Sequence, residues 1–172
     1  MRLLSIDPSI NECGVAVIID GELVRAYTIK TQKHKSVECR LRQLNDAFTH
    51  VGSDFTHAII EHPNTFVKKG MFGDERIAPM QTLHIAIGTI YASLCQISDL
   101  EIKFVKVSEW KGGVGKGQAQ NMVRALTGVL HNTHESDAIV MGMRWSKKQR
   151  IDQLHTTNKS TKIKKIKKRK IP

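Results

Sequence analysis

Three short apolar segments follow one another near the start of the chain, and this succession constrains the fold more than any other feature of the sequence. They are Leu3–Ile6, Val15–Ile19 and Leu23–Ile29. The second and third are separated by Asp20-Gly21, a dipeptide that favours the type I′ turn of a β-hairpin. The sequence therefore predicts an antiparallel meander of three strands.

The apolar period then changes from that of strands to that of helices. From Ser36 onward apolar residues recur on one helical face, and strand patterns return at Ala58–Ile60 and Ile102–Val107. Further helices are predicted from near Pro79 to Ile97, through Met122–Leu130, and from about Glu135 to Ser146. The order β-β-β-α-β-α-β-α-α predicts an α/β domain with a mixed five-stranded sheet flanked by helices.

The formal charge of +11 is distributed unevenly along the chain. Residues 1–146 hold 16 basic against 15 acidic side chains, whereas residues 147–172 hold 11 basic side chains against the single Asp152. We therefore expect a near-neutral folded domain over 1–146 and a basic C-terminal tail over 147–172. From Lys159 the tail has only isolated isoleucines to bury, so we expect it to be disordered when free.

Several classes of protein are excluded by these features. The near-neutral body excludes a uniformly cationic nucleic-acid coat, and no stretch approaches the ~18 consecutive apolar residues of a membrane span. The first residues also lack the pattern of a secretory signal. The three cysteines are scattered, which indicates reduced thiols of a cytosolic protein and neither a disulfide framework nor a zinc site.

Acidic residues stand where two of the predicted strands end. If the strands that end at Asp7 and Glu61 are parallel neighbours, both carboxylates emerge at one edge of the sheet. His134 and Asp137 share a face at the start of the last helix. Such a set suits Mg²⁺ or Mn²⁺, and two such ions can drive phosphodiester hydrolysis. The alternatives are that Asp7 only forms a turn and that Asp137 is acidic only because the helix dipole favours a negative charge near the start of a helix.

Three motifs around these residues resemble the acidic motifs of the RuvC family of Holliday junction resolvases. They are Leu4-Ser-Ile-Asp7-Pro-Ser with Gly14, Ile59-Ile-Glu61, and His134-Glu-Ser-Asp137-Ala. The segment Gln120–Arg124 is also similar, and the resemblance covers about residues 1–145. It implies a ribonuclease H-like fold, a homodimer, and metal-dependent paired nicking of four-way DNA junctions.

The resemblance also assigns roles to single residues. It implies metal ligands at Asp7, Glu61 and Asp137, and a fourth catalytic and metal-binding position at His134, for two ions per active site. Because imidazole stands at His134 where the family often has a carboxylate, we expect Mn²⁺ to support cleavage at least as well as Mg²⁺. The compact size suggests a phage-type member, which would act in the cytoplasm of a bacterial or phage-infected cell; a nuclear or organellar location is the alternative.

A glycine-rich loop lies between the last predicted strand and the helix after it. Its sequence, Lys111-Gly-Gly-Val-Gly-Lys116-Gly, is similar to the phosphate-binding loop of ParA-type ATPases. Gly117, however, stands where a hydroxyl must bind Mg²⁺, so we expect no nucleotide cofactor. The RuvC resemblance gives Lys111 a catalytic counterpart and gives Lys116 none. Either ammonium could hold the scissile phosphate, and an exposed lysine on a flexible loop is the alternative.

Two further segments are candidates for contact with DNA. The RuvC family places an aromatic residue soon after the glutamate of the second motif, and the candidates here are Phe66 and Phe72, with Lys68 and Lys69 between them. Folding back onto the core is the alternative for these aromatic rings. In the tail, the basic candidates for backbone contacts are Lys164, Lys165, Lys167, Lys168 and Arg169.

The predicted helix over 80–97 carries apolar residues on more than one face, which favours a two-fold partner. Cutting two strands of a junction needs two active sites, so a homodimer is expected, with branched DNA as its partner and no membrane. Two other functions stay open: a ribonuclease H-like nuclease for other branched DNA or RNA–DNA hybrids, and a non-catalytic junction-binding protein. His62, Trp110 and Trp145 are expected to be structural, and Glu12, Glu109 and Glu135 to be solvated.

Overall fold

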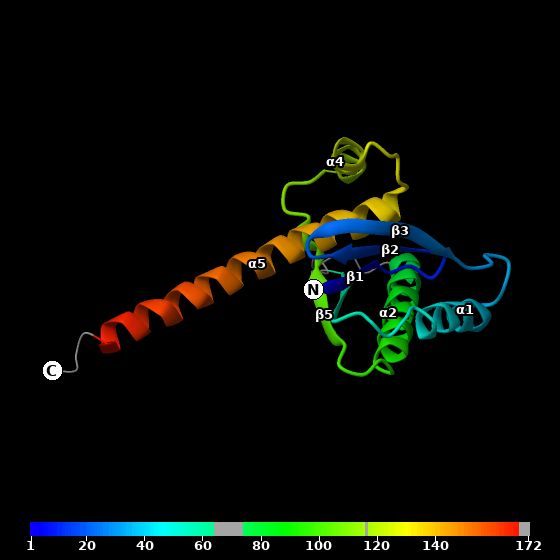
Figure 1. The fold of residues 1–172 in the computed structure, drawn as a ribbon. Helices are drawn as coiled ribbons and strands as arrows, with labels where there is room; N and C mark the ends of the chain where they lie inside the picture. The colour runs from blue at the N-terminus through cyan, green and yellow to red at the C-terminus, as the bar shows by residue number, and fades with distance from the viewer. Residues whose placement is uncertain (64–73, 116, 169–172) are drawn as a thin grey trace.

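The computed structural model describes residues 1–63, 74–115 and 117–168, with side chains placed except at 74–78 and 156–168 (Figure 1). Five strands form one mixed sheet in the order β3-β2-β1-β4-β5. They are β1 (Arg2–Asp7), β2 (Glu12–Ile19), β3 (Glu22–Lys30), β4 (His57–His62) and β5 (Glu101–Lys106). The predicted α/β class and the five-stranded mixed sheet are confirmed.

The predicted meander and the parallel pairing of the central strands are both present. β1 pairs antiparallel with β2, and β2 with β3, through a turn in which Asp20 and Gly21 have φ values of 52° and 91°. These positive values are those of a type I′ turn. β1 also pairs parallel with β4, and β4 with β5. The carboxyl ends of β1 and β4 therefore meet at the same edge.

Helices cover both faces of the sheet, which makes three layers (Figure 1). One face packs on α1 (Val37–Thr49) and α2 (Asp74–Leu94). The other packs on α3 (Val107–Trp110), α4 (Gln118–Thr127) and α5 (Thr133–Lys168). Both faces of the central strands are thus buried, which explains why those strands are apolar throughout. No helix in the described part of the chain is long and apolar enough to cross a bilayer.

Helix α5 lies unusually close to the sheet. A Cβ atom on Gly142 would overlap the side chain of Ile18 and lie 2.8 Å from the Cβ of Ser5. The Ser5 hydroxyl in turn donates a 2.7 Å hydrogen bond to the carbonyl of Ala138. Small residues on the helix and on β1 therefore fix the height of α5 above the strands, and so the position of its first turns.

Several helix boundaries differ from those predicted. The short helix α3 was not predicted, and α4 ends at Thr127 and not at Leu130. Helix α2 begins at Asp74, before Pro79, which lies inside the helix and not at its start. Helix α5 does not end near Ser146 but continues to Lys168, so the segment expected to be a disordered tail is helical up to that residue. Residues 143–168 contain no glycine or proline and many good helix formers, and nothing in the local sequence ends the helix. Beyond the sheet it continues alone (Figure 1).

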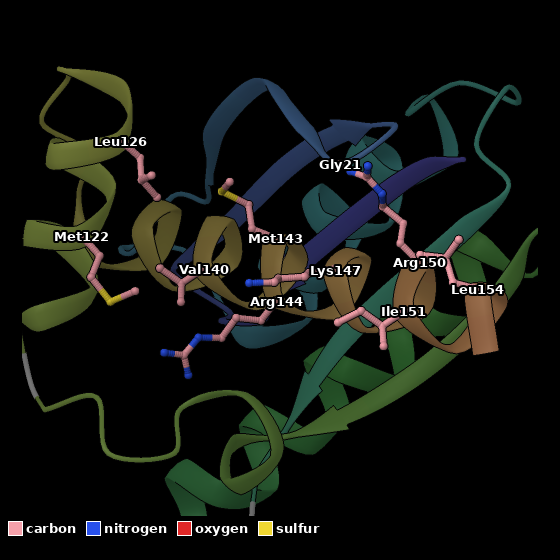
Figure 2. A pocket seen from close by; sticks show the side chains of 10 residues that line it. All are labelled: Gly21, Met122, Leu126, Val140, Met143, Arg144, Lys147, Arg150, Ile151 and Leu154. Carbon is pink, nitrogen blue, oxygen red and sulfur yellow. The ribbon is translucent and has the colours of Figure 1, made fainter.

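A groove runs between α4 and α5 (Figure 2). It has a volume of about 610 Å³ and is lined by residues of α4, of α5 and of the turn between β2 and β3.

Candidate active site

The ends of β1 and β4 and the start of α5 meet at one edge of the sheet. Ile6 pairs with Ile60, so the residues that follow them, Asp7 and Glu61, come out side by side. The start of α5 reaches this edge because β2 has a glycine opposite Asp7. A Cβ on Gly14 would overlap the carbonyl of His134 and lie 2.9 Å from the next amide nitrogen.

All five residues predicted to be catalytic come together here. The Nδ1 atom of His134 lies 2.6 Å from an Oδ atom of Asp7, and the Nζ atom of Lys111 lies 2.9 Å from an Oδ atom of Asp137. Glu61 is close enough to Asp7 and Asp137 to interact electrostatically with both. Asp7 is only 8% exposed, so its carboxylate is largely shielded from solvent.

The proximity of three carboxylates changes how they hold protons. Burial, together with the charges of Asp7 and Asp137, raises the pKa of Glu61 from its ordinary value of 4.5 to about 7. Burial also raises the pKa of Asp7, and the contact with His134 offsets only part of that effect. The same contact raises the pKa of His134. The site therefore carries more negative charge than Lys111 and His134 can neutralise without retained protons.

This donor set fits a divalent cation. Carboxylate oxygens with one imidazole nitrogen are ligands that Mg²⁺ and especially Mn²⁺ accept, and a cation would relieve the repulsion that raises the pKa of Glu61. No three of these groups, among the residues described, already form a metal cage. Each carboxylate instead contacts a donor of its own: His134, Lys111 or the indole of Trp110. A cation that binds Asp137 would take the place of Lys111 in this contact.

The pKa of Glu61 predicts that Mg²⁺ stabilises the fold more at high pH than at low pH. A carboxyl whose pKa is higher in the folded state loses stability as the pH rises from the unfolded value of about 4.5 to the folded value of about 7. A cation binds the ionised carboxylates and offsets that loss. We expect Mg²⁺ to raise the Tm by several degrees at about pH 8 and by little at about pH 5.5. Calorimetry with and without Mg²⁺ measures this; an equal rise at both values, or the same difference in Glu61→Gln, would contradict it.

Trp110, expected from the sequence to be structural, also contacts the carboxylate cluster. It is 2% exposed and does pack in the core, but its Nε1 also donates a 2.9 Å hydrogen bond to an Oε atom of Glu61. Its carbonyl accepts a hydrogen bond from Arg144 of α5. Because Lys111 follows directly, the short helix α3 delivers one donor to Glu61 and another to Asp137. The signal in the sequence was a tryptophan next to a candidate catalytic lysine.

Trp110→Phe is expected to weaken metal use while leaving the fold intact. Phenylalanine keeps the buried ring but removes the N–H that orients Glu61, and outer hydrogen bonds of this kind change metal affinity by about tenfold or more. We expect a roughly tenfold higher Mg²⁺ concentration for half-maximal cleavage and a Tm within a few degrees of the parent. Trp145→Phe is the matched control, since Trp145 stacks near His57 and Lys103 and not on the carboxylates. A Mg²⁺ requirement that is the same in both variants would remove the orienting role.

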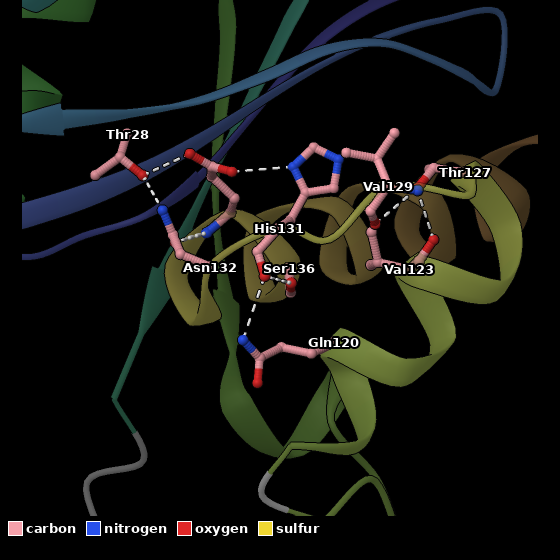
Figure 3. A network of polar contacts seen from close by, with 9 residues as sticks. Thr28, Gln120, Val123, Thr127, Val129, His131, Asn132 and Ser136 are labelled. Carbon is pink, nitrogen blue, oxygen red and sulfur yellow. Dashed lines mark hydrogen bonds and ion pairs between the residues drawn. The ribbon is translucent and has the colours of Figure 1, made fainter.

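Glu135 is not solvated as expected but lies in a polar network with Thr28, His131 and Asn132, three residues that Figure 3 shows together. Its carboxylate accepts a 2.8 Å hydrogen bond from the Thr28 hydroxyl of β3 and lies 2.9 Å from His131 Nδ1. These contacts outweigh burial and lower the pKa of Glu135. Asn132 accepts from the amide of Glu135 and donates to Thr28, so it caps α5 and ties the helix start to the sheet. The spacing Asn132-x-x-Glu135 is that of a capping box and could have revealed this role.

Glu12 and His62 also have defined partners. Glu12 pairs with Lys33 at 3.0 Å, which lowers the pKa of Glu12. His62 turns away from the carboxylates, as the alternation of the strand predicted, and packs against His84 and Phe104.

The remaining site predictions are not tested. Phe66, Lys68, Lys69, Phe72, Lys116 and Arg169 lie outside the described residues. Lys164, Lys165, Lys167 and Lys168 lie on α5, but only their backbone is described. Helix α3 stands between β5 and the glycine-rich loop, so the loop does not directly follow a strand as a nucleotide-binding loop would, and Lys111 contacts Asp137.

Comparison with known proteins identifies the fold. No model of a known protein family matches the sequence, and no curated protein sequence matches it. Among solved structures, Thermus thermophilus RuvC in complex with a Holliday junction substrate matches with a TM-score of 0.71 at 16% identity, over 88% of this chain and 96% of that one. The chain has the RuvC fold. A second Thermus thermophilus RuvC structure matches with a TM-score of 0.62 at 17% identity, over 83% of this chain and 92% of that one.

The match confirms that the chain has the fold that the predicted resemblance implied. Nearly the whole RuvC chain is matched, so the likeness extends beyond the central sheet to the helices on its two faces. At this level of identity the match establishes how the backbone is arranged. The chemistry that this fold can carry out depends on the side chains described above.

Proposed function

We propose that this chain is a metal-dependent endonuclease that resolves four-way DNA junctions by paired nicking. The observation that carries the proposal is the cluster of Asp7, Glu61 and Asp137 at one sheet edge, so crowded that the pKa of Glu61 rises to about 7. A cluster that stores repulsion in this way is suited to divalent cations and poorly suited to a purely structural role. The structural match to a RuvC bound to a Holliday junction substrate supports the choice of DNA substrate.

In the proposed site, some residues bind the cations and others bind the phosphate of the DNA. Asp7, Glu61 and Asp137 would hold the ions, with His134 as the nitrogen ligand. When bound, a pair of ions activates a water molecule and stabilises the leaving oxygen of the scissile phosphodiester. Lys111, released from Asp137, would hold a phosphate oxygen and neutralise the charge that develops on it. Trp110 keeps Glu61 oriented throughout.

An exposed apolar patch supports a homodimer as the active form. Ile85 and Tyr91 of α2 are 51% and 41% exposed, and Phe104 of the edge strand β5 is 46% exposed. The rings of Tyr91 and Phe104 lie with their centroids 5.5 Å apart, so these two side chains form one apolar surface across α2 and β5. A two-fold partner on this patch would supply a second active site for the second strand.

A panel of DNA substrates tests the proposal. Purified protein is incubated in Mg²⁺ or Mn²⁺ with a four-way junction, a fork, a flap, a linear duplex and an RNA–DNA hybrid of equal length, and its mass is measured by light scattering. We expect a dimer that cuts the junction into two nicked duplexes and leaves the linear duplex intact. Preferential cleavage of the hybrid, fork or flap would instead indicate another ribonuclease H-like nuclease. Junction binding without cleavage in either metal would indicate a non-catalytic junction-binding protein.

Deleting residues 159–172 is expected to weaken DNA binding and make it less dependent on salt. The deletion removes eight basic side chains, and each phosphate that the shorter protein no longer neutralises lowers the slope of log K against log salt by roughly 0.9. Cleavage at low salt should persist because the carboxylate cluster is untouched. Titrations between about 50 and 200 mM salt measure the slope. A full-length variant with these lysines changed to glutamine is the control for chain length; an unchanged slope in both variants would show that the tail does not bind DNA.

A further inference from the structure

The groove between α4 and α5 is lined largely by apolar side chains that stand open to solvent (Figure 2). Leu126 of α4 is 63% exposed, and Ile151 and Leu154 of α5 are 44% and 65% exposed. Burying such side chains against a partner gains roughly 25 cal/mol per Å² of apolar surface. None of the residues of the carboxylate cluster lines the groove, so the two are separate.

The lining residues of α5 follow the spacing of a helix-packing seam. Val140, Arg144, Lys147, Ile151 and Leu154 are separated by alternating steps of four and three residues, and they point from one side of the helix (Figure 2). This is the heptad spacing with which one helix receives the side chains of another. Helix α4 forms the second wall, so the groove offers a seat for one further helix.

The charge of the seam selects the occupant. Arg144, Lys147 and Arg150 all line the groove, and no acidic residue of the described chain is among its lining residues. A second copy of α5 laid along the seam would oppose these cations with its own, which is unfavourable. DNA would satisfy the cations but would gain nothing from the exposed leucine and isoleucine side chains. Apolar and cationic groups are satisfied together by an amphipathic helix that has acidic residues beside its apolar stripe.

We propose that the α4–α5 groove is a docking site for an acidic amphipathic helix of a partner protein. The occupant would place an apolar residue at every third or fourth position against Leu126, Ile151 and Leu154, with Glu or Asp facing Lys147 and Arg144. Because Arg144 also holds the carbonyl of Trp110, the bound helix would lie one side chain away from the segment that orients Glu61. The docking itself does not depend on nuclease activity.

Fluorescence anisotropy with a labelled synthetic helix tests the proposal. The probe is a peptide of about 18 residues, long enough to form a helix, with leucines on one face and glutamates beside them. One control peptide has serine in place of leucine, and the other has lysine in place of glutamate. We expect the acidic amphipathic peptide to bind the full-length protein at least about tenfold more tightly than either control.

Variants of the groove locate the binding site. Leu126→Ser combined with Leu154→Ser, and separately Lys147→Glu, should each weaken peptide binding by at least about tenfold. Leu130→Ser is the matched control, since Leu130 is 71% exposed but does not line the groove. Equal binding of all three peptides, or binding that the groove variants leave unchanged, overturns the proposal. Displacement by duplex DNA with no effect of the leucine variants also overturns it and assigns the groove to DNA.

Discussion

Asp7→Asn is expected to reduce junction cleavage by at least about a thousandfold while leaving junction binding intact. Asparagine keeps the shape of the side chain and can still accept from His134, but it removes the charge that a cation at the sheet edge would need. Metal ions contribute several kcal/mol to such reactions, and about 4 kcal/mol corresponds to a factor of a thousand. Single-turnover cleavage and a binding titration in Ca²⁺ measure the two effects separately.

The same substitution is also expected to change the pKa of Glu61. Asp7 is one of the charges that raise the pKa of Glu61, so its removal should lower that pKa and reduce the stabilisation by Mg²⁺. Asp46→Asn is the matched control, because Asp46 is exposed on α1, which packs on the other face of the sheet. Cleavage by Asp7→Asn at the parental rate would place the chemistry elsewhere and sink the assignment of the carboxylate cluster.

Gly14→Ala is expected to cost both stability and activity. The new methyl group would overlap the backbone carbonyl of His134, and a backbone group cannot turn aside as a side chain can. Overpacking of this kind typically costs about 1–3 kcal/mol. Relief comes from moving the start of α5 away from β2, which separates His134 and Asp137 from Asp7 and Glu61. We expect cleavage to fall by at least about tenfold beyond what the loss of folded protein explains.

Gly88→Ala provides the control for an added methyl group. Gly88 lies in α2 with nothing within 4 Å of the position of a new Cβ, so alanine there should raise stability by about 0.5–1 kcal/mol. Thermal denaturation and cleavage rates of both variants separate strain from the general effect of alanine. A Gly14→Ala protein with parental Tm and parental rate would show that the helix start and β2 can separate without consequence for the site.

The positions of four candidate site residues could be predicted because each one ends or begins a strongly patterned element. Apolar strands lead directly into Asp7 and Glu61, and the capped start of α5 carries His134 and Asp137. Strand pairing then brings these positions together without any side-chain detail. The hydrogen bond from Trp110 to Glu61 could not be predicted in this way, because it depends on how α3 turns after β5.

The helix boundaries were harder to predict for a physical reason. Composition indicated that residues after Lys159 could not bury a core, but a helix with good local propensity can continue without a core beneath it. Similarly, Pro79 suggested a helix start because proline suits a first turn, whereas α2 accommodates it five residues further in.

The unbroken course of α5 sets a distance. At 1.5 Å per residue, Lys164 lies ~40 Å along the helix from Asp137, which is the length of roughly twelve base pairs of duplex DNA. The lysines near the end of α5 are therefore held at a fixed distance from the active site. They would contact a DNA arm only about one full turn of the duplex from the nick. Junctions with shorter arms would be bound only by residues 1–146. Cleavage of such junctions should therefore depend on salt differently from cleavage of junctions with long arms.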